Sequence, residues 1–74
     1  MAESVYKIIE LVGTSTESWE RAARAAIERA GESLEDLRVA EIAKFDLVVE
    51  DNKIKAYRAR VHLSFKYHGE GEDE

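Results

Sequence analysis

VYKIIELVGTST at residues 5–16, with Trp19 close behind it, is the stretch that decides the fold of this chain. Its first eight residues are apolar except for Lys7 and Glu10. Val, Ile and Tyr favour extended backbone, and a run with so few polar side chains is typical of a strand that is covered on both faces. We therefore predict a strand over residues 4–12.

A helix is predicted directly after this strand. Gly13 ends the apolar run, and Ser15 is the predicted N-cap because its hydroxyl can accept a hydrogen bond from a free amide of the first turn. Glu17 follows at a place where the helix dipole favours negative charge. Gly31 is the predicted end of the helix. Apolar residues recur at steps of three and four and form one stripe: Trp19, Ala22, Ala23, Ala26, Ile27, Ala30 and Leu34.

This stripe is mostly alanine, and small side chains let a helix lie close to a sheet. We therefore expect a thin subunit. Trp19, as the large member of the stripe, is expected to serve core or interface packing.

Two long strands are predicted over residues 37–49 and 54–67. In the second of them the odd positions from Tyr57 to Tyr67 are apolar, and the even positions from Arg58 to Lys66 are polar. Glu50-Asp51-Asn52-Lys53 is a polar turn between them, in which Asn52 tolerates a left-handed backbone. The predicted fold class is α+β, a β-α-β-β subunit whose three-stranded antiparallel sheet wraps around one helix.

The predicted lengths do not match one another. Strands of about 13 residues span roughly 40 Å, whereas a helix of about 16 residues spans roughly 24 Å, so the helix cannot cover the sheet. The strand over residues 37–49 also carries apolar side chains on both predicted faces, with Val39, Ala43, Phe45, Leu47 and Val49 on one and Ala40, Ile42 and Val48 on the other. Such a patch usually marks an interface, and self-assembly is the simplest way to cover it.

Length and charge limit the remaining possibilities. A chain of 74 residues is one domain, here residues 1–74 with an ordered core of about 4–67 and an acidic tail at 69–74. It has no cysteine, so oligomerisation must replace disulfides or a thiolate zinc site as the source of extra stability. The net charge of −5 disfavours nucleic acid and anionic membranes as partners. No signal-peptide pattern or long apolar run is present, which favours a cytoplasmic location.

No catalytic pattern stands out. Ser15 lacks the Gly-x-Ser-x-Gly context of a nucleophile elbow, and Gly13 lacks the further glycines of a phosphate-binding loop. His62 and His68 lie too far apart along one strand to share a metal within a subunit. We therefore expect a protein that is not an enzyme.

The junction of strand, Gly-Thr-Ser and helix resembles that of the dodecin family, and the resemblance runs from Val5 to Tyr67. Dodecins are small flavin-binding proteins that assemble into hollow shells of twelve subunits. The resemblance therefore implies a hollow homododecamer, and the number twelve follows from it alone.

Three positions depart from the flavin-binding members of this family. Val39 stands where they usually carry a tryptophan that stacks on the flavin ring, Arg58 stands where they tend to have glutamine, and Asp46 stands where an arginine is common. The run Leu37-Arg38-Val39-Ala40 is instead similar to the calcium-associated branch, which lacks the stacking tryptophan. No cofactor is certain from the residues. The resemblance to this branch implies calcium ahead of FMN or riboflavin.

The function predicted from the sequence is a non-catalytic shell that binds or sequesters a small ligand or cations. Flavin storage is the first alternative, and a structural or partner-binding scaffold is the second. The candidate ligand-binding residues are Val39, Glu41, Asp46, Tyr57 and Arg58, and the candidate calcium ligands are Glu17, Glu41, Asp46 and Asp51. Because Glu41 interrupts the apolar face of Val39, Ala43 and Phe45, it needs a basic partner across the hairpin, such as Arg58 or Arg60.

Overall fold

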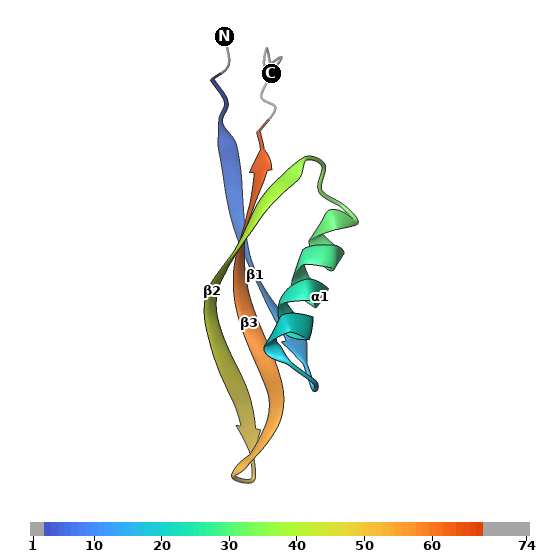
Figure 1. The fold of residues 1–74 in the computed structure, drawn as a ribbon, viewed down its shortest axis with the longest axis vertical. Coiled ribbons are helices and arrows are strands. Elements are labelled where there is room, and N and C mark those ends of the chain that lie inside the picture. The colour runs from blue at the N-terminus through green and yellow to red at the C-terminus, as the bar shows by residue number, and fades with distance from the viewer. Residues whose placement is uncertain (1–2, 68–74) are drawn as a thin grey trace.

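The computed structural model describes residues 3–67 of the chain. The elements follow in the order β1 (Tyr6–Ser15), α1 (Trp19–Gly31), β2 (Leu37–Glu50) and β3 (Lys53–Lys66). The three strands form one antiparallel sheet in the spatial order β1-β3-β2, and α1 lies on one face of it (Figure 1). The predicted β-α-β-β order and the three-stranded antiparallel sheet are confirmed. The predicted acidic tail and His68 lie outside the described residues.

Gly13 does not end the first strand, as predicted, but lies inside β1 and opposite Ala59. A Cβ atom at this position would clash with the carbonyl oxygen of Ala22 and would lie 3.1 Å from the Cβ of Ala26. Glycine is needed here because the backbone of α1 comes so close to the sheet, and the backbone stays extended through it.

The helix begins later than the sequence indicates. Ser18 is its N-cap, and the Ser18 hydroxyl accepts a hydrogen bond from the Arg21 amide at 3.0 Å. Ser15, the predicted N-cap, is the last residue of β1, and its hydroxyl accepts from the Glu17 amide at 2.9 Å in the connecting turn. Gly31 is the last residue of the helix, as predicted.

The hydrophobic core is small and lies between α1 and the central strand β3. The buried residues of the helix are all alanines, with Ile27 partly buried against them, and Leu63 and Val61 are the largest fully buried side chains of the described residues. The buried residues are Ala22, Ala23, Ala26, Ala30, Ala59, Val61 and Leu63. The predicted alanine stripe and the predicted alternation in the last strand are therefore confirmed.

A β-bulge at Ala43 changes which side chains of β2 face the helix. Ile42 pairs with Val61 and Lys44 pairs with Arg60, so Ala43 is an extra residue on β2. Phe45 consequently lies opposite Ala59, on the same face as Ile42. The prediction that placed Phe45, Leu47 and Val49 with Val39, and Val48 with Ile42, is wrong, because inserted residues shift the period of two.

The β2–β3 hairpin extends well past α1 and past the end of β1 (Figure 1). Asp51 and Asn52 form its two-residue turn, with φ values of 53° and 62°, which is typical of a type I′ turn. The subunit measures 55 × 20 × 16 Å, and α1 packs on β1 and β3 while scarcely reaching β2. The predicted mismatch between helix and sheet is therefore present. Among residues 3–67, no helix is both long and apolar enough to cross a membrane.

Candidate functional site on the outer face of the sheet

The face of the sheet that α1 leaves uncovered, here called the outer face, carries four of the five predicted ligand-binding residues. Residues that pair directly across antiparallel strands point to the same side. The pairs Val39–Ser64, Glu41–His62 and Asp46–Arg58 therefore lie on the side opposite to the pair Phe45–Ala59, which faces the helix. The side chains of this surface lie in rows that cross β1, β3 and β2.

Asp46 and Arg58 close one end of the outer face with an ion pair. The Nε of Arg58 donates to Oδ1 of Asp46 at 2.7 Å, and Nη2 donates to Oδ2 at 2.8 Å. The hydrogen bond from Arg58 lowers the pKa of Asp46, and the same bond raises the pKa of Arg58. Both carboxylate oxygens thus accept hydrogen bonds from Arg58, and the positive charge of the guanidinium opposes the approach of a cation to Asp46.

Glu10, His62 and Glu41 form a row across all three strands. The Nε2 of His62 lies 3.2 Å from Oε2 of Glu10, and its Nδ1 lies 3.9 Å from Oε1 of Glu41. The predicted partners of Glu41, Arg58 or Arg60, are wrong, since Arg60 pairs with Glu10 at 3.5 Å. The two carboxylates approach different nitrogens of one imidazole ring, so they do not converge on a common point.

Tyr57 lies on the opposite side of the sheet from the other candidate ligand residues. Its ring centroid is 5.3 Å from that of Trp19, and the Phe45 centroid is 5.5 Å from Trp19. Trp19 also donates from Nε1 to the carbonyl oxygen of Asp46 at 3.1 Å. This cluster fixes the start of α1 on the hairpin. The sequence did not reveal it because the bulge at Ala43 moves Phe45 to the helix side.

The four predicted calcium ligands are not brought together within one subunit. Glu17 precedes α1 and pairs with Arg21 of its first turn at 3.1 Å, whereas Asp51 lies in the hairpin turn. Glu41 and Asp46 belong to different rows of the outer face. Across the described range 3–67, no group of three or more His, Cys, Asp or Glu side chains is arranged to hold a metal ion.

Comparison with known proteins places this geometry in a family. The dodecin family model matches residues 5–68. The calcium dodecin of Mycobacterium tuberculosis is 44% identical over 63 residues, which cover 85% of this chain and 89% of that protein. The dodecin of Thermus thermophilus is 36% identical over 62 residues, covering 84% of this chain and 90% of the relative.

Solved structures agree with the sequence comparison. The dodecin from Streptomyces coelicolor superimposes with a TM-score of 0.85 at 28% identity, covering 93% of this chain and 99% of that structure. The crystal structure of the M. tuberculosis calcium dodecin, described as a calcium-chelating antigen with a novel calcium-binding site, gives a TM-score of 0.77 at 46% identity, covering 86% and 91%. The sequence, the β-α-β-β fold and these matches together show that the chain belongs to the dodecin family of non-catalytic binding proteins, in agreement with the absence of enzymatic function predicted above.

Proposed function

We propose that this protein forms a homo-oligomeric shell, a hollow homododecamer, that binds or sequesters cations, with calcium as the first candidate. The observation that carries this proposal is the apolar surface that the sheet leaves open beyond its helix. Phe45, Val49 and Ile54 are 55%, 60% and 60% exposed, although large apolar side chains of this kind are normally covered in a soluble protein. Copies of the same chain are the simplest cover, and closed symmetry is the usual result.

Cation binding is supported by the similarity to calcium dodecin and by the carboxylates of this chain. Calcium takes about six to eight oxygen ligands, more than any carboxylate cluster of one described subunit offers. Symmetry repeats each carboxylate around an axis, so a site between copies would collect the missing ligands. The proposed site therefore depends on assembly.

Glu41 is the carboxylate best placed for this role. Its side chain is 72% exposed, and within residues 3–67 its one ion-pair partner is His62, at 3.9 Å. Asp46 and Glu17, by comparison, are engaged by arginines at 2.7 Å and 3.1 Å. We rank Glu41 first, Asp51 second, and the two paired carboxylates last.

Flavin binding ranks below cation binding on the geometry of the same surface. Val39 offers a smaller contact area than an aromatic ring, and the guanidinium of Arg58 is occupied by Asp46. Tyr57 cannot supply the missing aromatic platform beside Val39, because it faces α1 and contacts Trp19 in a T-shaped arrangement. A scaffold without a ligand is the remaining alternative.

Calcium titration by isothermal calorimetry tests the proposal. After removal of bound metal with a chelator, the oligomer is expected to give a saturable heat with calcium. Glu41→Gln is expected to reduce the affinity by about tenfold or more, since one charged ligand is lost from each site. Glu28→Gln, an isosteric change on the exposed surface of α1, is the matched control and should bind like the unchanged protein.

Three results would contradict this function. An oligomer that gives no heat with calcium and does not quench riboflavin or FMN fluorescence would be a scaffold, whereas quenching of either flavin would support flavin storage. Sedimentation velocity on the same sample reports assembly separately. A folded monomer would overturn the shell and, with it, the cation site.

A further inference from the structure

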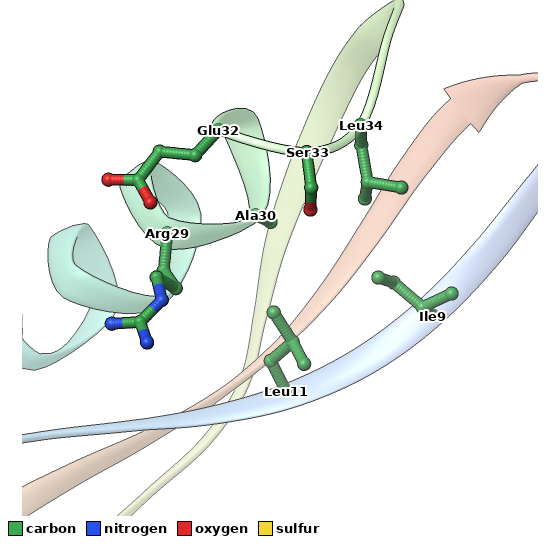
Figure 2. A pocket seen from close by; sticks show the side chains of 7 residues that line it. All are labelled: Ile9, Leu11, Arg29, Ala30, Glu32, Ser33 and Leu34. Carbon is green, nitrogen blue, oxygen red and sulfur yellow. The ribbon is translucent and has the colours of Figure 1, made fainter.

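An apolar groove lies where α1 ends, between the helix and β1. Its volume is about 340 Å³. Ile9 and Leu11 of β1 point toward the end of the helix, and Leu34 points toward Ile9 from the segment after it (Figure 2). Ala30 forms the floor on the helix side, and the polar side chains of Arg29, Glu32 and Ser33 complete the lining. This groove is on the same face of the sheet as α1.

The free end of the β2–β3 hairpin is a projection, whereas the site at the end of α1 is a groove. β1 stops at Ser15, which pairs with Tyr57, so the hairpin beyond this point is a two-stranded ribbon with no third strand (Figure 1). Val49 and Ile54 pair with each other next to the turn and are 60% exposed, while Phe45 is exposed on the helix side. A two-stranded ribbon is marginally stable in water, so this projecting end requires a cover.

The charges at the two places are complementary. Arg29 and Glu32 of the groove make no ion pair within residues 3–67, and neither do Asp51 and Lys53 at the hairpin turn. The other two charged residues of the turn region, Glu50 and Lys55, already pair with each other at 3.0 Å. One free anion and one free cation therefore stand at each place, and the groove and the turn can satisfy each other.

We propose that the β2–β3 hairpin of one copy docks into the groove at the end of α1 of the next copy, with Val49 and Ile54 on Ile9, Leu11 and Leu34. Asp51 then meets Arg29, and Lys53 meets Glu32. This inference rests on the self-assembly in the proposed function and names the surfaces that carry it.

The position of the two surfaces determines the type of contact. The hairpin projects beyond the start of α1, whereas the groove lies at its end, so the contact joins two different patches. Such head-to-tail contacts either close into a ring or continue as an open filament. In a closed shell the contact must form rings, so every hairpin is inserted and every groove is filled.

Cysteine cross-linking tests the contact, because the chain has no cysteine of its own. The double variant with Leu34→Cys and Val49→Cys is treated with a short bis-maleimide. Both members of the contact are present in each chain, so we expect covalent ladders that end in closed rings on a denaturing gel. Mixing the two single variants after dissociation and reassembly should give mainly dimers that contain one copy of each.

The controls separate this inference from the proposed function. Val49→Cys combined with Glu28→Cys, which places the second thiol on the exposed surface of α1, should give no ladder. Efficient dimers from Val49→Cys alone would indicate hairpins packed on each other and would overturn the inference. An oligomer in sedimentation velocity without ladders from the Leu34 and Val49 pair would also overturn it, while leaving the shell intact. A monomer would contradict the shell itself.

Charge reversal provides a second test that does not change the apolar contact. Arg29→Asp is expected to weaken assembly by about twofold to fivefold, the range of an exposed ion pair. Adding Asp51→Arg to the same chain should restore the lost affinity, because the pair is then reversed. Absence of any restoration would contradict the proposed pairing of these two residues.

Discussion

The helix-covered part of the sheet and the projecting hairpin use the same strand β3 for opposite purposes. From Ala59 to Leu63, β3 is buried under the alanines of α1, and Gly13 of β1 lets the helix backbone approach. From Lys53 to Ala56, β3 lies in a ribbon that neither β1 nor α1 covers, and its Ile54 is 60% exposed. The first part stabilises the subunit, whereas the second carries the apolar area that we propose other copies cover.

Gly13 should show the largest effect on the covered part. Gly13→Ala places a Cβ against the carbonyl oxygen of Ala22, and the core is too small to compensate. We expect a loss of about 3 kcal/mol in the free energy of unfolding, enough to prevent folding of a small domain. Urea denaturation followed by circular dichroism measures this loss.

Gly31 supplies the matched control for Gly13. A Cβ at Gly31 meets no atom within 4 Å, and alanine favours a helix. Gly31→Ala is therefore expected to raise stability by about 0.5–1 kcal/mol. Equal effects at the two glycines would contradict the close approach of α1 to β1.

Substitutions in the projecting hairpin should weaken assembly and leave the stability of the subunit nearly unchanged. Val49→Ser combined with Ile54→Ser removes two exposed apolar side chains, so the fold of the subunit should change little. The dissociation constant of the assembly is expected to rise by at least about 100-fold, since each side chain contributes about 1.5–3 kcal/mol when buried. Sedimentation velocity at decreasing protein concentration measures the change, with Ala25→Ser on the exposed side of α1 as the control.

The start of the helix offers a smaller test of the covered part. Ser18→Ala removes the N-cap hydrogen bond to Arg21 and should cost about 1 kcal/mol. Ser15→Ala removes only the bond to Glu17 in the turn and should cost less. Thermal denaturation of the two variants ranks them, and a larger effect at Ser15 would place the cap where the sequence first indicates it.

The smallest expected effect concerns the Asp46–Arg58 pair, which spans the two strands where the hairpin leaves the helix. The pKa of Asp46 is lowered in the folded protein. The pair therefore contributes its full stability above the pKa that this carboxyl group has in the unfolded chain, about 3.9. That contribution is lost as the pH falls through the lower pKa of the folded protein. We expect a small decrease in stability below about pH 4, weakened by salt because the pair is exposed. Asp46→Asn should abolish this pH-dependent component, as acid titration followed by fluorescence of Trp19 would show.

Local sequence patterns were sufficient for much of the fold. The alanine stripe predicted α1 and the face that it buries, and the alternation from Tyr57 to Leu63 predicted the buried side of β3. They failed where a residue acts through a distant contact. Gly13 was predicted to end the first strand, because the residue that requires glycine there is Ala22 of α1, which is far from it in the sequence pattern of the strand. The faces of β2 were misassigned because the bulge at Ala43 has no signature in the strand itself.

The candidate site was predictable as a set of residues but not as an arrangement. Val39, Asp46 and Arg58 lie on the same outer face, yet Tyr57 lies on the other side, and the close pairing of Asp46 with Arg58 emerged only from the register. Glu41 meets His62 and not an arginine, because that same register decides which side chains stand opposite each other.

By itself the sequence determined the order of the elements, the residues of α1 that are buried and the shortage of helix relative to sheet, since all three follow from periodicity and length along the chain. Only the tertiary structure decided which face each side chain of β2 occupies, why residue 13 must be glycine, and which end of the hairpin stands uncovered. These features depend on register and on close approach between segments far apart in the chain. A period of two carries no information about where a single extra residue will interrupt it.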